Sequence, residues 1–280
     1  MTGSWSLHPE PGAMRRNKGF SLVELAVALA IIALLLAGAM IPLSTQMDVR
    51  NVADSRRTME SIRESIVGFT QANGRLPCPA DGSLAAGTAN AGTEQLNGLS
   101  PNTTCTNAFG VVPWATLGVP ETDGWGRRFS YWVSQNFADG IGFTGTHGCA
   151  PAPIPLPTQS SFALCSLGTL TVNTRRESDH SPTPVGLVLP AVIISHGKNG
   201  FGAYTVSGGA RLAVPAGTDE ALNATNAGST FYSRTQTPNP SPLSCNDNPG
   251  PSGFCEFDDI VVMITSNTLI ARMVAAGKLP

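Results

Sequence analysis

Three groups of side chains in this sequence of 280 residues have types and spacings that could do chemistry. Asp258 and Asp259 are adjacent carboxylates, the ligand type that calcium prefers, although calcium needs more oxygens than two neighbouring carboxylates supply. Ser195 and His196 place a hydroxyl beside an imidazole. Neighbours in a strand point to opposite faces, which disfavours a nucleophile and base pair. The sequence contains no GxSxG, HExxH or phosphate-binding glycine motif, so we predict that the protein is not an enzyme.

The third group is a single carboxylate, Glu24, at the head of an apolar run. Residues 25–41 are seventeen consecutive apolar residues, and residues 20–23 bring the segment to the length of a membrane span. The basic residues upstream, at 15, 16 and 18, predict a cytoplasmic N-terminus. No small-x-small cleavage site closes the run, which disfavours an ordinary signal peptide. A carboxylate is costly in lipid and marks a functional site by default.

The segment Lys18-Gly19-Phe20-Ser21-Leu22-Val23-Glu24-Leu25, followed by the apolar run, resembles the prepilin signature of type IV pilins and type II secretion pseudopilins. The resemblance implies that a prepilin peptidase cuts after Gly19 and methylates Phe20, so that the apolar segment stays in the mature protein. It also implies that Glu24 pairs with the terminal ammonium of a neighbouring subunit during assembly. Residues 1–19 are then a leader peptide, with residues 1–13 a mis-set start.

A long helix is expected from Phe20 to about Ala72. Beyond the apolar run, hydrophobic residues recur at helical spacings; they are Met47, Val52, Met59, Ile62, Ile66 and Phe69. Asn73-Gly74 is a helix-end signal, and Pro77 forbids continuation. The predicted domains are therefore a transmembrane and assembly helix over 20–42, an amphipathic helix over 43–76 that packs on the head, and an extracytoplasmic head over 77–280. A plain membrane anchor with a juxtamembrane coiled coil is the alternative.

The head is expected to be β-rich, because the chain contains 30 Gly and 22 Pro without a repeat. Strand signals occur at 128–133 and at 260–265, the latter typical of a central strand. Residues 185–195 are predicted as one buried strand interrupted by Pro190, and residues 269–276 as a short helix. The predicted fold class is α+β: a long N-terminal helix, membrane-spanning in its first half, packed on a small antiparallel sheet with long disulfide-stapled loops.

Six cysteines occur, and all follow Pro77; they are Cys78, Cys105, Cys149, Cys165, Cys245 and Cys255. An even number confined to the head predicts disulfides in an oxidising compartment. The sequence does not decide among the possible connectivities. Nearest-neighbour pairing is attractive because each pair brackets a loop with little core of its own. A zinc site from His147, Cys149 and His196 is disfavoured, because the spacing is irregular and no CxxC motif is present.

A weaker resemblance extends into the head. Residues 123–131 are similar to the Asp-x-Trp-Gly…Tyr turn and strand of major pseudopilins, and residues 195–200 stand in place of their glycine-rich turn. Residues 257–260 resemble their acidic segment, which helps to bind a structural calcium. The resemblance thus offers Asp258 and Asp259 as calcium ligands. Asn199 stands where that family has an aspartate, so we favour a solvated strand start and expect no cofactor.

The formal net charge of −2 excludes a general nucleic-acid binder, which would carry a basic excess. The sequence therefore predicts a structural subunit, a minor pilin or pseudopilin of a type IV pilus or type II secretion filament. Its expected partners are other pilin subunits, the prepilin peptidase and the bacterial inner membrane, with the head periplasmic and the filament periplasmic or extracellular. Long loops at 78–108 and 215–253 favour a minor subunit. The alternative is a surface adhesin or calcium-binding module on a pilin-like anchor.

Overall fold

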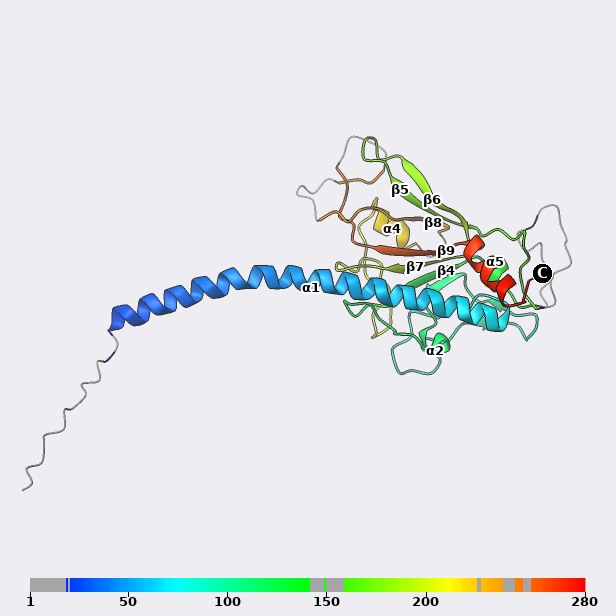
Figure 1. Cartoon of the computed structure of the whole chain (residues 1–280), viewed down its shortest axis with the longest axis horizontal. Helices are drawn as coiled ribbons and strands as arrows, with labels where there is room; N and C mark the ends of the chain where they lie inside the picture. Colours follow the sequence, from blue (N-terminus) through cyan, green and yellow to red (C-terminus); the bar gives the residue numbers. More distant parts are fainter. Residues whose placement is uncertain are drawn as a thin grey trace, which may run out of the picture. The chain divides into compact units, whose positions relative to one another are not determined.

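The computed structural model describes residues 19, 21–141, 149, 159–225, 228–238, 245–248 and 253–279, and it leaves out the side chains of residues 37–44. The chain divides into two units, Met1–Met47 and Asp48–Pro280. The predicted long helix is confirmed as α1, Leu22–Asn73, which begins in the first unit and ends in the second (Figure 1). In the part of the chain that is described, no helix is apolar over a length sufficient to cross a membrane.

Two main sheets form the second unit, residues 48–280, which is called the head from here on and includes the second half of α1 together with the predicted head over 77–280. A four-stranded sheet has the order β3-β4-β7-β9, with all neighbours antiparallel; its strands are Phe109–Val111, Ser130–Val133, Ala191–Ser195 and Ile260–Ile264. A three-stranded sheet has the order β6-β5-β8; its strands are Pro182–Leu189, Leu170–Arg175 and Thr230–Tyr232. The prediction of a small antiparallel sheet is thus correct for the first sheet and incomplete for the head, because β5 and β8 are parallel.

The remaining elements are short. Leu96–Asn97 (β1) and Thr104–Cys105 (β2) form a two-stranded hairpin within the segment predicted as a loop. The helices are α2 (Trp114–Leu117), α3 (Gln135–Ala138), α4 (Asp219–Asn223) and α5 (Ser266–Ala275). The C-terminal helix agrees with the prediction, and the side chain of Thr265 caps it by accepting the Thr268 N–H.

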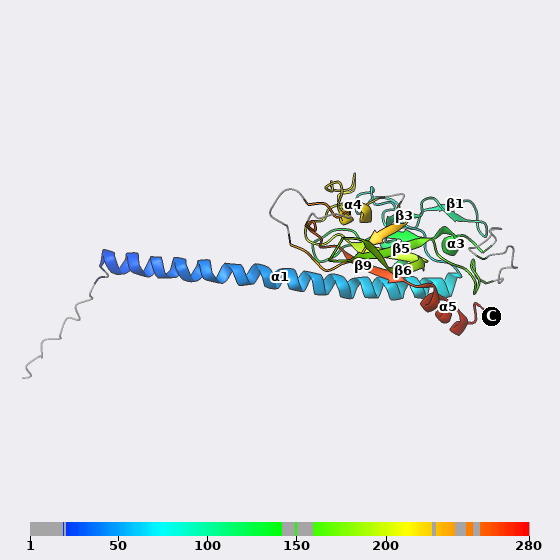
Figure 2. The same cartoon turned by 90° about the horizontal axis from the view of Figure 1, so that it is seen from above.

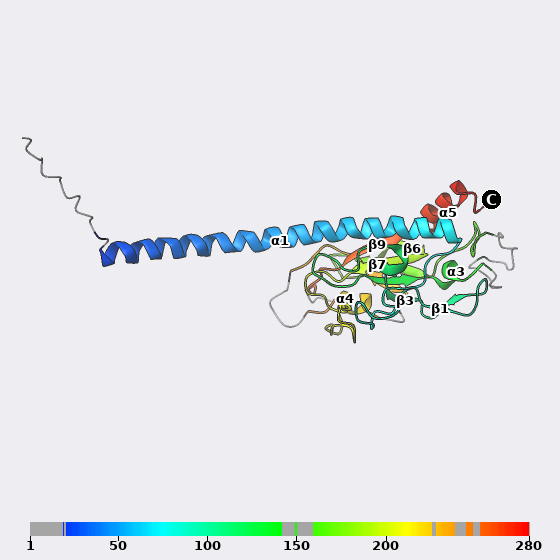
Figure 3. The ribbon, with the colours of Figure 1, turned by 90° about the horizontal axis from the view of Figure 1, so that it is seen from below.

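The head has three layers, with the four-stranded sheet in the middle. Because strand side chains alternate between faces, Tyr131 and Ile193 pack with Ile62 of α1 on one face. Trp132 and Val192 pack with Phe231 of the three-stranded sheet on the other. Figures 2 and 3 show α1 running along one side of these strands. Met59, Ile62 and Ile66 of α1 are fully buried, and burying a side chain of this size contributes about 1.5–3 kcal/mol.

The prediction of one buried strand over 185–195 is wrong. Residues 182–189 and 191–195 belong to different sheets, on either side of Pro190. All of β7 is buried, whereas Val185 and Leu187 of β6 are 50% and 58% exposed. Residues 260–264 are also not central, because β9 is the last strand of its sheet. An apolar run shows that a segment is β-prone, but not to which sheet or position it belongs.

Three disulfides pair the cysteines with their nearest neighbours, as Cys78–Cys105, Cys149–Cys165 and Cys245–Cys255. The predicted disulfides are therefore confirmed. A disulfide that closes a loop of this length adds about 2–4 kcal/mol to the free energy of unfolding, mainly by restricting the unfolded chain. The zinc alternative is wrong, because the Cys149 sulfur is bonded to Cys165; His147 lies outside the described residues.

Candidate functional site

The first candidate site is the start of α1. The Ser21 N–H donates to Glu24 Oε2 at 2.9 Å, and the Glu24 N–H donates to Ser21 Oγ at 3.1 Å. This reciprocal pair is a capping box, which satisfies two backbone donors that a helix start leaves free. The Ser-x-x-Glu spacing is the sequence signature of such a box, and the sequence analysis did not use it. Both residues are exposed, as is Gly19, while Phe20 lies outside the described residues.

The second candidate site is a group of three carboxylates in the head, here called the acidic cluster: Glu220, Asp258 and Asp259. One carboxylate oxygen from each lies within 4.8 Å of the others. Glu220 comes from α4, which Thr218 starts by capping the Ala221 N–H at 3.0 Å. Asp258 and Asp259 directly precede β9. Chain segments far apart in sequence thus bring three negative groups together inside the head.

Hydrogen bonds hold some of the oxygens of the acidic cluster but not all of them. Glu220 accepts the Asp258 N–H at 2.8 Å and the side-chain amide of Asn199 at 3.1 Å. Asp258 Oδ2 accepts the Asn199 N–H at 2.8 Å, and Asp259 Oδ2 accepts the Asn223 amide at 2.7 Å. Within the described part of the chain, Asp258 Oδ1 and Asp259 Oδ1 form no hydrogen bond although both atoms are buried; His196 Nδ1 lies 3.4 Å from Asp259 Oδ1 without bonding to it. Such orphaned oxygens need an explanation, because an unsatisfied buried polar group is costly.

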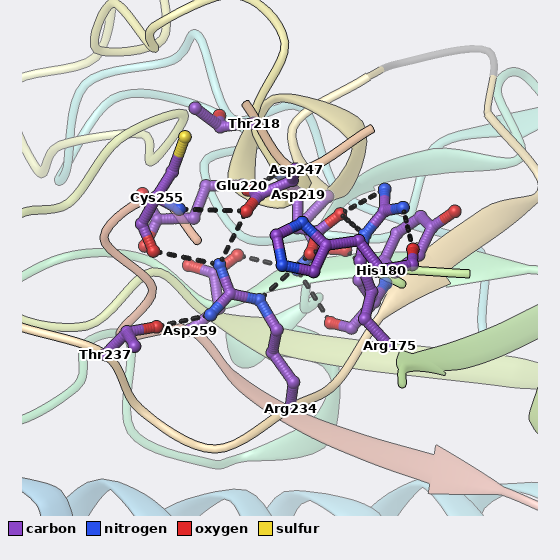
Figure 4. Close-up of polar contacts among 12 residues, drawn as sticks. Arg175, His180, Thr218, Asp219, Glu220, Arg234, Thr237, Asp247, Cys255 and Asp259 are labelled. Atoms are coloured by element: carbon purple, nitrogen blue, oxygen red, sulfur yellow. Dashed lines mark hydrogen bonds and ion pairs between the residues drawn. The ribbon is translucent and has the colours of Figure 1, made fainter. Parts of the chain in front are cut away.

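Two buried arginines lie close by, but other carboxylates neutralise them. Arg175 pairs with Asp219 at 2.7 Å, and Arg234 pairs with Asp219 at 2.9 Å and with Asp247 at 3.2 Å. Figure 4 shows Arg234 held between these aspartates, Thr237 and the backbone of Cys255. Two positive and two negative charges balance in this network. The network therefore has no net positive charge left to compensate the carboxylates of the acidic cluster beside it.

The pKa values of the three carboxylates are raised, because no positive charge fully compensates their ionised forms inside the head. Burial, followed by the charge of Asp259, raises the pKa of Glu220 to about 9. Burial raises the pKa of Asp259 to about 8 and that of Asp258 to about 6. In the absence of a cation, the cluster therefore holds protons at neutral pH. A cation that binds to the cluster would displace these protons, and its positive charge would then compensate the ionised carboxylates.

A serine, a histidine and an aspartate also line up next to the acidic cluster. Ser130 Oγ lies 2.9 Å from His196 Nε2, and His196 Nδ1 lies 3.4 Å from Asp259 Oδ1. Ser195 instead donates to Asp123 at 2.7 Å, so the adjacent Ser195 and His196 do not pair, as the sequence predicted. Ser130 and His196 are fully buried, and burial lowers the pKa of His196 to about 3. Because the Ser130 hydroxyl has no exposed surface and no hydrogen bond joins His196 to Asp259, this alignment does not by itself support a reactive centre.

Two neighbouring aromatic residues of β4 lie in different parts of the core. Tyr131 is fully buried on the face toward α1 and Trp132 on the face toward the three-stranded sheet. They are core residues of opposite layers. Glu220 is the site residue that the sequence analysis missed. Its only local signal is its place in the first turn of a capped helix, which says nothing about a partner 38 residues later.

Comparisons with known proteins bear on the first site. The family model for the prokaryotic N-terminal methylation motif matches residues 14–40, and this motif is the signature of type IV pilins and pseudopilins. The chain therefore carries the pilin-type segment that the sequence indicated, which points to a type IV pilin-like subunit. No curated protein and no solved structure matches the chain.

Proposed function

We propose that the protein is a structural subunit, a minor pilin or pseudopilin, of a type IV pilus or type II secretion filament. The observation that carries this proposal is the methylation motif over residues 14–40. The prepilin peptidase cuts after Gly19 and methylates Phe20. The retained helix is held in the bacterial inner membrane with the head in the periplasm, and it then packs against the helices of other subunits.

The proposed role of Glu24 is to neutralise the new terminal ammonium of a neighbouring subunit. A carboxylate in an apolar helix becomes tolerable when an opposite charge docks beside it. Processing removes the peptide bond that precedes residue 20, so the first turn becomes a chain terminus. The capping box and the ammonium of the neighbour then compete for the same carboxylate, and the charged partner forms the stronger hydrogen bond.

Three variants in the native host test this proposal. Glu24→Gln keeps an oxygen that can accept the Ser21 N–H but removes the charge, so it should be processed normally and be absent from filaments. Glu24→Ala should behave in the same way. Ser21→Ala, the matched control, removes the capping hydroxyl and leaves the charge, so it should still assemble. Mass spectrometry of the mature N-terminus measures processing, and immunoblotting of sheared filaments measures assembly. Normal assembly of Glu24→Gln would contradict the charge-pairing role.

We also propose that the acidic cluster binds calcium, because its two orphaned oxygens and uncompensated charge favour a cation. The donor set fits: all three groups are hard oxygen ligands, and their mutual distances suit the loose geometry of calcium. Gly197 leaves room for the cluster, since a Cβ there would lie 2.2 Å from Asp258 Oδ1. Glu220, Asp258 and Asp259 would hold the ion and keep the entry to β9 in place. Calcium would supply positive charge, not a reaction.

Thermal unfolding of the purified chain in detergent tests the calcium proposal. A ligand present at 100 times its dissociation constant adds about 2.7 kcal/mol to the free energy of unfolding. For a domain of this size, that corresponds to a rise of about 5–11 °C in Tm. Glu220→Gln should remove the response, whereas Asp54→Asn, an exposed carboxylate of α1, should keep it. An unchanged Tm in millimolar calcium would show that the cluster holds protons instead.

A further inference from the structure

Within the described residues, two of the four outer edges of the two main sheets are paired and a third carries prolines. At the β3 edge, Ala80 and Val111 exchange two backbone hydrogen bonds of 2.9 and 3.0 Å. At the β8 edge, the Asn223 amide takes the place of a strand, accepting the Tyr232 N–H at 2.7 Å and donating to its carbonyl at 2.9 Å. The β6 edge carries Pro182 and Pro184, which have no N–H to offer. These are the ordinary ways in which proteins protect a sheet edge.

The fourth edge, along β9, is open. The Ser134 N–H donates to the Pro190 carbonyl at 2.7 Å, which fixes the alternation of hydrogen bonds across β4, β7 and β9. In the register of β7 with β9, Val262 bonds toward β7, so the N–H and C=O of Val261 and Met263 point away from the sheet. No described residue outside β7 forms a backbone hydrogen bond to either of them. The strand, Ile-Val-Val-Met-Ile, contains neither a proline nor a charge that would block pairing.

A cavity lies along this open edge. Its volume is about 830 Å³, and Asp259 to Val262 form one wall. Residues 233–236, which follow β8, form a second wall, and Arg56 and Glu60 of α1 form a third. Thr237 and Phe257 pair through backbone hydrogen bonds of 3.0 and 3.1 Å, and no backbone hydrogen bond joins residues 233–236 to residues 258–262. The cavity is therefore a groove between α1 and the segment that follows β8, and the backbone at the start of β9 lies along it.

The charge in the groove indicates what would bind there. Arg56 is exposed and has no ion pair or hydrogen bond with any described residue. It faces the cavity from the α1 side, which is the side toward which every second residue of an added strand would point. A strand added beside β9 would therefore meet backbone donors and acceptors along its length. On the α1 side it would meet Arg56 and Glu60, and of these two only Arg56 lacks a charged partner among the described residues, because Glu60 pairs with Arg63 at 2.5 Å.

We propose that the β9 edge is a docking site for an extended segment of another polypeptide, which adds a fifth strand to the four-stranded sheet and places an acidic side chain opposite Arg56. Backbone hydrogen bonds to Val261 and Met263 would provide affinity, and the acidic residue would provide selectivity. The complex would close the remaining open edge among those described above.

A synthetic strand tests the proposal with the full chain in detergent. The probe is a capped seven-residue peptide with valine at odd positions and threonine, aspartate and threonine at even positions. Amide hydrogen exchange followed by mass spectrometry should show protection of residues 258–266 when the peptide binds. Val261→Pro removes an outward N–H that the β7 ladder does not use, so it should fold normally and weaken binding at least about tenfold.

Charge variants give a second measurement that does not depend on the backbone of β9. Arg56→Glu should weaken binding about three- to fivefold and should prefer a peptide with lysine in place of the aspartate. Arg57→Glu is the matched control, because Arg57 is 80% exposed, pairs with Asp54 and does not line the groove; it should bind as the parent chain does. Absence of protection at about 1 mM peptide, or equal binding by Val261→Pro, would overturn the proposal. If the amides of β9 become protected when the concentration of the chain is raised without peptide, the occupant is a second copy of the chain, and this result would also overturn the proposal.

Discussion

In the absence of divalent cations, raising the pH should destabilise the head, which is the opposite of what salt-bridged carboxylates do. Burial raises the pKa of Asp259 from 3.8 to about 8. Between these values the unfolded chain has lost this proton while the folded chain still holds it. The folded state therefore binds more protons, and the free energy of unfolding falls as the pH rises through this window.

The size of the effect follows from the interval over which the two states differ. From 3.8 to pH 7 the interval corresponds to about 4 kcal/mol, at about 1.36 kcal/mol per pH unit. Local relaxation and water entry lower the value, so it is an upper bound. Glu220 and Asp258 act in the same direction, but their effects cannot be added because the three carboxylates interact with one another. A loss of even half this amount is a large part of the stability of a typical domain.

Urea unfolding of the chain at pH 5 and pH 7.5, in buffer freed of metal ions, measures this effect. The parent chain should have the higher midpoint at pH 5. Asp259→Asn cannot titrate at this position and still offers an oxygen to Asn223, so it should show a smaller difference between the two pH values. Calcium added at pH 7.5 should restore the midpoint of the parent chain. A parent midpoint that rises with pH relative to Asp259→Asn would refute the reasoning, because it would mean that the carboxylate is ionised and well compensated.

Two further predictions concern the packing and the disulfides of the head. Ile62→Ala should lower the free energy of unfolding by about 2–5 kcal/mol, since Ile62 is fully buried between α1 and the sheet; Val274→Ala, at a position 42% exposed, should change the urea midpoint little. The double variant Cys78→Ser with Cys105→Ser should lower the thermal midpoint by an amount equivalent to about 2–4 kcal/mol, and a midpoint equal to that of the oxidised parent would contradict the stapling role of this loop closure.

The features predicted correctly from the sequence are those whose signal is local. Helix α1 follows from apolar spacing over residues 47–69, and its end follows from Asn73-Gly74. The nearest-neighbour disulfides close short loops, so proximity in sequence was a fair guide. The division of residues 185–195 between two sheets was missed, because the apolar content of both halves is similar. The prolines at 182 and 184 were the available sign that the first half is an edge strand.

The solvated strand start expected at Asp258 and Asp259 is wrong, because Asp259 is buried. Asn199 stands where the resemblance leads one to expect an aspartate, and this substitution was one of the reasons to disfavour calcium, beside the small number of oxygens that two carboxylates supply. In the structure, the Asn199 amide donates to both carboxylate oxygens of Glu220 at 3.1 Å, and its backbone N–H donates to Asp258. The third carboxylate thus comes from α4, and Asn199 orients it. A linear motif records which residue occupies a position, whereas the number of carboxylates at a site depends on which elements the fold brings there. In this chain Glu220 of α4 supplies the carboxylate that Asn199 does not. The calcium proposal rests on this replacement of one carboxylate by another.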